Sequence, residues 1–233
     1  MTMPDPYTDP DFATAALVTI DTQRDVLDGG PLEIPGTSAA LEQMRLRAQE
    51  FGEAGKPIVH VVRLYEPDGS NVDLCRRRAV QNGARILATG TPGSQLAVEV
   101  LPAPDLTFDC ALLLDGGVQS LGPGEVAIYK PRWGAFYRTP LENHLREQGV
   151  TTIVFCGCNF PNCPRTSIYE ASERDFRVVL ARDAISGLYE RGESELTNIG
   201  VRLMSTAEVT SELATATRGT SRSLSSGSRE TGG

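Results

Sequence analysis

Four largely apolar runs place the strongest limit on how this chain folds. They span residues 15–20, 57–64, 152–156 and 177–181, and segments with helical periodicity separate them. Strands that are apolar throughout are buried on both faces, which is typical of a parallel sheet covered by helices on either side. The sequence therefore predicts an α/β fold in which strands and helices alternate.

The remaining elements follow from shorter patterns. Two further apolar runs occupy residues 110–114 and 126–130, and residues 207–210 are predicted to form a short final strand. Helices are predicted over residues 38–54, 74–80, 140–148, from 164 onward, and 193–204. We expect three regions: an extended lead-in over residues 1–14, one domain over 15–210, and a tail over 211–233. The tail is rich in Ser, Thr, Gly and Arg, and such a composition predicts disorder.

Composition and charge disfavour several kinds of partner and several cellular locations. With 233 residues the chain fits one sizeable domain, and its net charge of -8 disfavours nucleic acid or an anionic membrane surface as a partner. No apolar run approaches the roughly 18 residues of a membrane span, and the first residues do not resemble a signal peptide. We therefore expect a cytoplasmic protein. The five cysteines, an odd number with three close together, indicate reduced thiols rather than a disulfide framework.

One cysteine occupies a position suited to chemistry. A buried strand ends at Cys156, a turn containing Gly157 and Pro161 follows, and a helix is predicted from Pro164. Cys163 therefore lies at a helix N-terminus, where the positive end of the helix dipole lowers the pKa of a thiol. This pattern fits a nucleophilic cysteine, and it fits a buried inert thiol equally well.

Two charged residues lie at comparable positions. Asp21 and Lys130 each follow an apolar strand, and ligand sites of parallel sheets lie outside the carboxyl ends of the strands. Asp21 is a candidate general base, or alternatively a loop cap; Lys130 is a candidate partner for it, or alternatively a solvated lysine. The two histidines fit catalysis less well, because His60 lies within a predicted buried strand and His144 on a polar helix.

These residues belong to three segments that resemble a known family. Residues 16–27 (ALVTIDTQRDVL), 129–150 (YKPRWGAFYRTPLENHLREQGV) and 151–186 are similar to blocks of the isochorismatase-like cysteine hydrolases, and the similarity extends over residues 15–210. Its most specific element is a strand that ends in Gly157, with Cys163 six positions later. The resemblance implies a Rossmann-like, three-layer αβα fold with a parallel sheet of about six strands.

The resemblance also implies a mechanism. Asp21 would act as general base and acid, Lys130 as its electrostatic partner, and Cys163 as the nucleophile that forms a thioester while a C–N bond of a small-molecule amide is hydrolysed. A non-proline cis peptide would join Cys158 to Asn159, and the amides of Asn159 and Cys163 would form the oxyanion hole. Members of the family are also expected to be homo-oligomers.

Several residues around the nucleophile differ from the family pattern. The loop contains Asn159, Phe160, Pro161 and Asn162 where small aliphatic residues are usual, so the pocket would have a different shape. We expect substrate contacts from four residues: Gln23, Trp133, Phe136 and Phe160. For Gln23 the alternative is a hydrogen bond within its own loop, and for Trp133 and Phe136 it is a place in the core or in a subunit interface.

No metal or other cofactor is predicted. Nicotinamidases of the family bind a metal through an Asp-x-His pair and a further histidine after the second strand, and residues 65–78 contain no histidine. The three cysteines at 156, 158 and 163 lack a fourth ligand for a structural zinc site. The arginines at 76–78 are typical of a solvated helix face, although they could attract an anionic substrate.

Other functions stay open at this point. The chain could hydrolyse the lactam of a streptothricin-like natural product, or it could be a non-catalytic relative that binds a small molecule or a protein. A redox sensor that joins Cys158 to Cys163 is a further alternative.

Overall fold

The computed structural model describes residues 5–226 and contains a seven-stranded sheet within three layers. The strand order is β3-β4-β2-β1-β5-β6-β7, and every neighbouring pair is parallel except β3 with β4. The strands are β1 (Ala15–Ile20), β2 (Ile58–Val62), β3 (Val118–Gly122), β4 (Glu125–Tyr129), β5 (Thr152–Gly157), β6 (Arg177–Ile185) and β7 (Arg202–Met204). The predicted α/β fold with a largely parallel sheet is confirmed.

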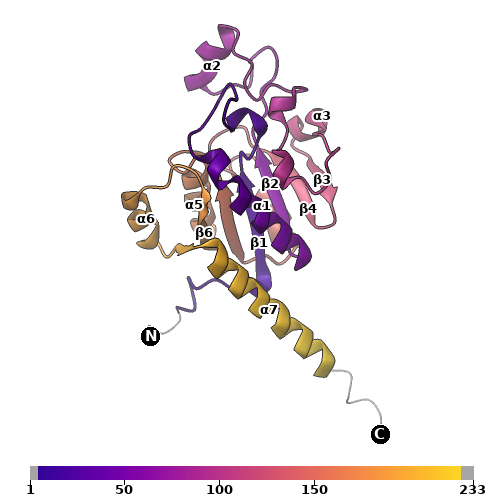
Figure 1. The fold of residues 1–233 in the computed structure, drawn as a ribbon, viewed down its shortest axis with the longest axis vertical. Coiled ribbons are helices and arrows are strands. Elements are labelled where there is room, and N and C mark those ends of the chain that lie inside the picture. Colours follow the sequence, from indigo (N-terminus) through magenta and orange to yellow (C-terminus); the bar gives the residue numbers. More distant parts are fainter. Residues whose placement is uncertain (1–4, 227–233) are drawn as a thin grey trace.

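Helices cover both faces of the sheet, as Figure 1 shows. The helices are α1 (Thr37–Glu53), α2 (Leu74–Gln81), α3 (Cys110–Leu114), α4 (Leu141–Glu147), α5 (Cys163–Ser172), α6 (Glu190–Thr197) and α7 (Thr206–Ser226). Short 3-10 helices occupy Phe12–Thr14, Arg24–Val26, Pro92–Ser94 and Val98–Val100.

The central strand β1 explains why helices cover both faces of the sheet. Its six residues are all buried, and alternate side chains enter different cores. Leu17 packs in one core with residues of α1 and α7, whereas Val18 packs in the other with residues of α4, α5 and α6. A strand buried on both faces requires apolar residues at every position, which accounts for the uninterrupted run in the sequence.

A third, smaller cluster lies over the carboxyl ends of the strands. Val26, Tyr65, Val72 and Cys158 belong to it, together with Ile86 and Leu87. Most of these residues come from the long connection between β2 and the 3-10 helix at Pro92–Ser94, which also carries α2 at one end of the molecule (Figure 1). This connection therefore forms a cover over the sheet edge at which Asp21 and Lys130 lie.

The structure differs from the sequence patterns in several places. The apolar run over residues 110–114 forms the helix α3, while the half-exposed edge strand β3, which has no apolar run, was not predicted. The end of the helix predicted over residues 193–204 forms strand β7. Residues 207–210 lie in α7, because Val209 and Leu213, four positions apart, face the core on one side of a helix.

The tail prediction is also wrong for residues 211–226, which continue α7. Thr210 connects this helix to α1, since its hydroxyl hydrogen-bonds with Glu50 and accepts a hydrogen bond from buried Arg47. Residues 227–233, the last part of the tail that was predicted to be disordered, lie outside the described residues. At the other end, residues 1–4 also lie outside them, and the lead-in from residue 5 onward contains turns and a 3-10 helix rather than a fully extended chain.

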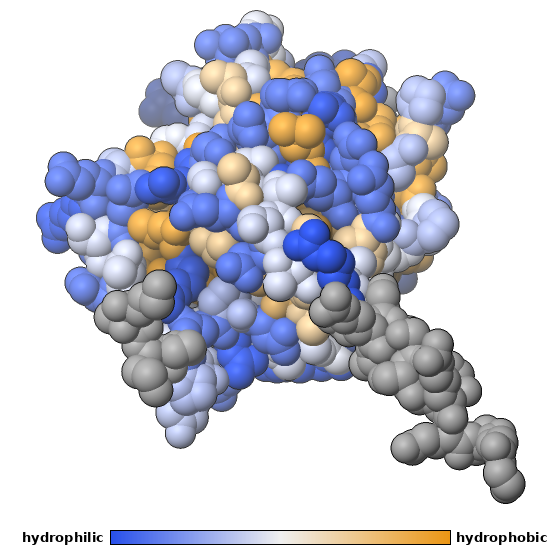
Figure 2. Space-filling model, turned by 60° about the horizontal axis from the view of Figure 1, so that its bottom comes forward, coloured by the Kyte–Doolittle hydropathy of each residue, from blue (hydrophilic) through white to orange (hydrophobic). Residues whose placement is uncertain are grey.

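Hydrophilic residues dominate the face shown in Figure 2, and hydrophobic residues gather there only in small, separate patches. Among the helices of the described residues, none has the combination of length and apolar character that crossing a bilayer requires.

Candidate active site

Three different segments bring Asp21, Lys130 and Cys163 to one edge of the sheet. Asp21 directly follows β1, Lys130 directly follows β4, and Cys163 begins α5 after the loop that leaves β5. The Nζ atom of Lys130 lies 2.8 Å from Oδ2 of Asp21. Lys130 is fully buried, and Cys163 and Asp21 are only 5% and 7% exposed. Asp21, Lys130 and Cys163 therefore meet at the carboxyl edge of the sheet, where their positions after the strands predicted them.

The backbone around Asp21 is held from both sides. Its N–H donates to the carbonyl of Val61 in β2, and its own carbonyl accepts hydrogen bonds from the N–H of Gln23 and the thiol of Cys158. Its φ of 50° lies in the left-handed region, which aspartate tolerates better than most residues. These contacts end β1 abruptly and orient the carboxylate toward Lys130.

One oxygen of the Asp21 carboxylate is engaged and the other is free. Oδ2 binds the Lys130 ammonium, whereas Oδ1 is buried and has no hydrogen-bond partner among the described residues. A buried carboxylate oxygen without a donor is costly, so this oxygen is available for the proton of a thiol, a water molecule or a substrate.

The surroundings of Cys163 oppose ionisation of its thiol. Burial and the neighbouring Asp21 carboxylate raise its pKa to about 11, although the positive charges of Lys130 and Arg63 act to lower it. The prediction of a lowered pKa is therefore wrong. The helix N-terminus is present as expected, but the loss of solvent and the adjacent anion outweigh it.

This pKa predicts slow alkylation of Cys163 near neutral pH. With a pKa of about 11, a thiol at pH 8 is roughly 0.1% ionised, against about a quarter for an unperturbed thiol. We expect iodoacetamide to modify exposed Cys75 at least ~100-fold faster than Cys163 at pH 8, with the Cys163 rate rising steeply up to pH 11. Peptide mass spectrometry of each cysteine against pH measures this. Modification of Cys163 ahead of Cys75 at pH 7 would show that the resting thiol is ionised.

The loop before Cys163 leaves two backbone donors unused. The N–H of Phe160 donates to the carbonyl of Ser186 and that of Asn162 to the carbonyl of Asn159. Among the residues that the structure describes, no hydrogen bond uses the N–H of Asn159 or of Cys163. These are the two amides expected to form the oxyanion hole.

The bond between Cys158 and Asn159 is trans, because the described part of the chain contains no cis peptide bond. The expectation of a cis bond is wrong. The trans form of a non-proline peptide is the more stable one by about 3–4 kcal/mol.

Two of the expected substrate contacts lie close to the candidate site. Gln23 is fully buried, and both ends of its amide are occupied: Nε2 donates to the carbonyls of Arg63 and Ser94, and Oε1 accepts from the N–H of Arg63. It therefore joins three loops beneath the site. Trp133 is half-buried, and the guanidinium groups of Arg63 and Arg76 lie 5.8 Å and 5.0 Å from its ring centroid.

The two phenylalanines lie within the core. The ring of Phe136 is 5.9 Å from that of Phe176, which directly precedes β6 and therefore lies at the opposite, amino edge of the sheet. Phe160 is fully buried, and its ring centroid lies 5.4 Å from that of Tyr189. The structure places Phe136 away from Asp21 and Lys130, and it directs the ring of Phe160 toward the residues around α6.

A buried ionic network beside the site was missed by the sequence argument. Arg63 is 1% exposed, and its Nη1 donates to both carboxylate oxygens of Asp73 at 3.0 Å and 2.9 Å. The hydroxyl of Tyr65 donates to the same carboxylate at 2.7 Å. Arg63 directly follows β2 and Tyr65 lies two residues further on, so their position at the carboxyl edge was the signal that could have identified them.

Nowhere in the described part of the chain do three or more His, Cys, Asp or Glu side chains gather as a metal ion would require. The connection after β2 places the cationic groups of Arg63 and Arg76 near the site, and positive charges oppose the binding of a cation. That the site uses no metal stays a prediction.

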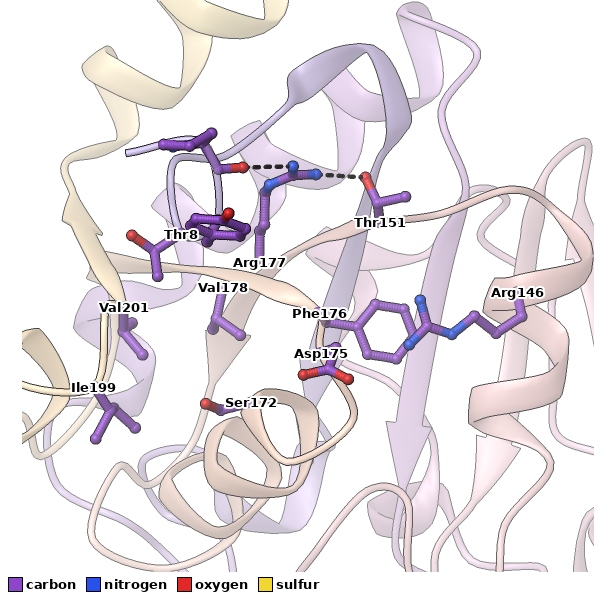
Figure 3. Close-up of a pocket in the computed structure, with 13 residues that line it drawn as sticks. Thr8, Arg146, Thr151, Ser172, Asp175, Phe176, Arg177, Val178, Ile199 and Val201 are labelled. Atoms are coloured by element: carbon purple, nitrogen blue, oxygen red, sulfur yellow. Dashed lines mark hydrogen bonds between the residues drawn. The ribbon is translucent and has the colours of Figure 1, made fainter. Parts of the chain in front are cut away.

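A separate surface cavity of about 490 Å³ lies at the opposite edge of the sheet (Figure 3). Its volume is that of a small-molecule site. Thr8 of the lead-in, Phe176 and Arg177 at the start of β6, and Val201 before β7 contribute to its lining. It contains no cysteine and no carboxylate–lysine pair, so the chemistry described above does not belong to this cavity.

A parallel α/β sheet that brings a cysteine, a carboxylate and a lysine to its carboxyl edge has the groups that a cysteine hydrolase requires. Comparison with known proteins agrees with this class. A family model for the isochorismatase domain matches residues 115–211. An uncharacterized isochorismatase family protein, YecD of Escherichia coli O157:H7, is 42% identical over 175 residues, which cover 74% of this chain and 80% of YecD. The chain belongs to the isochorismatase family, which is a family of hydrolases.

Two further relatives extend the comparison. The maleamate amidohydrolase of Pseudomonas putida is 28% identical over 172 residues, which cover 73% of this chain and 71% of that enzyme. The crystal structure of an isochorismatase family protein from Desulfovibrio vulgaris has a TM-score of 0.71 with 27% identity, over 86% of this chain and 98% of that one. The three-layer fold is thus the fold of the family.

Proposed function

We propose that this protein is a metal-independent cysteine amidohydrolase that cleaves the C–N bond of a small-molecule amide. The observation that carries the proposal is the buried ion pair of Lys130 with Asp21 beside the Cys163 thiol, in which Asp21 keeps one oxygen without a partner. Relatives named as amidohydrolases support the reaction class. Each group needed for acyl transfer to sulfur has a candidate at this sheet edge.

The reaction begins from a neutral thiol. As the Cys163 sulfur attacks the amide carbonyl, its proton passes to Oδ1 of Asp21, and the Lys130 ammonium keeps the carboxylate correctly placed. Negative charge develops on the carbonyl oxygen, and the unused N–H groups of Asn159 and Cys163 are suited to stabilise it. The Asp21 proton then moves to the leaving nitrogen, the C–N bond breaks, and a thioester remains on sulfur.

Hydrolysis of the thioester restores the protein. Asp21, again ionised, removes a proton from a water molecule that attacks the thioester carbonyl. The carboxylic acid product leaves, and the proton returns from Asp21 to the Cys163 sulfur. Because Cys163 is a weak acid at rest, proton transfer and attack are expected to occur together, with no stable thiolate beforehand.

The thioester makes the proposal testable. A panel of small linear and cyclic amides is incubated with the protein, and released amine or ammonia is measured. With a substrate, rapid acid quenching is expected to trap an acyl adduct on the peptide that contains Cys163. Cys163→Ala should lose at least ~10³-fold in kcat, whereas Cys75→Ser, which changes an exposed cysteine, should keep full activity. Turnover by Cys163→Ala would contradict the proposed nucleophile.

A cyclic amide in the panel also tests the lactam alternative. Tight binding of panel members without turnover would favour the non-catalytic relative. A homo-oligomeric state and a cytoplasmic location stay predictions, which size-exclusion chromatography with light scattering and cell fractionation would test.

A further inference from the structure

One side of helix α5 carries Cys163 and also two residues that contact the loop after Lys130. Side chains four and seven positions after Cys163 share its side of the helix, because one turn takes 3.6 residues. Ser167 and Glu170 occupy these two positions. Both hydrogen-bond with the backbone of residues 134–136, so the side of α5 that carries the candidate nucleophile is also the side that meets this loop.

The hydroxyl of Ser167 links the loop to the start of the helix. Ser167 is fully buried, and its oxygen accepts a hydrogen bond from the N–H of Ala135 at 3.0 Å. The same hydroxyl donates to the carbonyl of Cys163 at 2.7 Å. Because a backbone N–H can only donate, the direction of both hydrogen bonds is fixed. One side chain thus connects the residue that carries the sulfur to the loop that begins at Lys130.

The carboxylate of Glu170 forms a second link to the same loop. Its Oε2 accepts a hydrogen bond from the N–H of Phe136 at 2.8 Å. The carboxylate also lies directly against Gly134, where an added Cβ would overlap both of its oxygens. A glycine at this position therefore leaves the carboxylate room to reach Phe136. We refer to Ser167 and Glu170 together as the α5 clamp.

The sheet alone does not join the two parts of the candidate site. Lys130 follows β4 and Cys163 follows β5, and strands β2 and β1 lie between these two strands. Lys130 reaches Asp21, at the end of β1, through the 2.8 Å ion pair. The α5 clamp connects the loop after Lys130 directly to the helix of Cys163. This connection matters for rate, because displacement of a catalytic group by about 1 Å can cost ~10²-fold.

We infer that Ser167 and Glu170 are positioning residues. They hold the loop after Lys130 against α5 and thereby set the distance from the Cys163 sulfur to the Asp21–Lys130 pair. The inference rests on the proposed cysteine hydrolase function. The clamp acts through backbone groups, since its hydrogen bonds end on the N–H groups of the loop and on the carbonyl of Cys163.

Three substitutions release the loop in different ways. Ser167→Ala and Glu170→Ala each remove one link, and Gly134→Ala displaces the Glu170 carboxylate. We expect each to lower kcat by ~10–100-fold with little change in KM, because a displaced nucleophile slows the chemical step more than it weakens binding. Glu170→Gln keeps an oxygen that can accept the Phe136 N–H, so it should restore most of the wild-type kcat. A Gln variant as slow as the Ala variant would overturn the role of this hydrogen bond.

Alkylation of Cys163 by iodoacetamide gives a readout that needs no substrate. The Asp21 carboxylate and burial raise the pKa of this thiol. Movement of the sulfur away from Asp21 therefore lowers the pKa, and a pKa one unit lower gives about tenfold more thiolate at pH 8. The Ser167→Ala and Glu170→Ala proteins should react ~10-fold faster at Cys163 than wild type. Buried Cys156 and Cys158 should stay protected in both.

Trp133 reports the position of the loop itself. It is the only tryptophan of the chain and directly precedes Gly134. Release of the loop should shift its fluorescence emission to longer wavelength, and unchanged emission in both alanine variants of the clamp would contradict release. Glu173→Ala is the matched control for Glu170→Ala, because Glu173 is exposed at the end of the same helix. It should change neither kcat, nor alkylation, nor emission. Thermal unfolding of each variant shows whether it is folded.

The outcomes separate the positioning role from the proposed function. Wild-type kcat in both alanine variants of the clamp would overturn the positioning role and leave the amidohydrolase in place. Equal acceleration of alkylation at Cys156, Cys158 and Cys163 would also overturn it, because the whole fold would then have loosened. Faster alkylation confined to Cys163, combined with no hydrolysis of any amide by wild type, would support the clamp and overturn the proposed function.

Discussion

Asp21→Asn is expected to slow hydrolysis by at least ~10³-fold and, at the same time, to accelerate alkylation of Cys163. Hydrolysis slows because the asparagine side chain cannot accept the thiol proton or deliver it to the leaving nitrogen, and positioned acid–base groups contribute about 10²–10⁴-fold. Alkylation becomes faster because the carboxylate that raises the pKa of the thiol is removed. Lys130, which lowers that pKa, then has no competing anion.

The two effects are measured on the same samples. Amine release gives kcat/KM, and peptide mass spectrometry after iodoacetamide treatment at pH 8 gives the rate at Cys163. Asp28→Asn is the control, since Asp28 is exposed in the loop that follows the same strand, and it should change neither value. If Asp21→Asn instead slowed alkylation together with hydrolysis, Cys163 would depend on Asp21 for its reactivity even at rest.

Gly157→Ala is expected to destabilise the fold by about 3–5 kcal/mol, in the range of severe core substitutions. Gly157 ends β5 with a φ of 123°, a conformation that other residues rarely adopt. A Cβ there would lie 2.2 Å from the carbonyl oxygen and 2.6 Å from the nitrogen of Ile20 in β1. Both are backbone atoms of the central strand, so neither can move without disturbing the sheet and the adjacent Asp21.

Urea unfolding followed by circular dichroism measures this loss. Gly52→Ala is the matched control, because Gly52 lies in α1 and its added Cβ would meet no atom closer than 3.8 Å. Alanine is the better helix former by up to about 1 kcal/mol, so this variant should be as stable as wild type or more so. A Gly157→Ala protein with wild-type stability would show that β1 and β5 can separate at this position without loss.

Much of the architecture follows from local patterns. The apolar runs that became β1, β2, β5 and β6 predicted a covered parallel sheet, because only strands buried on both faces lack polar alternation. Asp21 and Lys130 could be placed together since parallel strands end at one edge. The pattern was weaker where one face meets solvent, as in β3, and where a small-residue helix such as α7 carries few apolar positions.

The chemistry of the site depends on contacts between distant segments. The residues next to Cys163 in the sequence indicate that it begins a helix. They do not indicate its raised pKa, because burial by the whole fold and the charge of Asp21 raise that pKa. The same holds for Arg63 and Arg76. In the sequence they are an arginine within an apolar strand and one of three adjacent arginines. Only folding of the connection after β2 brings both guanidinium groups beside Trp133. The order of elements in the sequence thus determined that Asp21, Lys130 and Cys163 lie at one edge of the sheet. Tertiary packing decided how these charged groups act on one another, since electrostatic energies depend on distance and on exclusion of water.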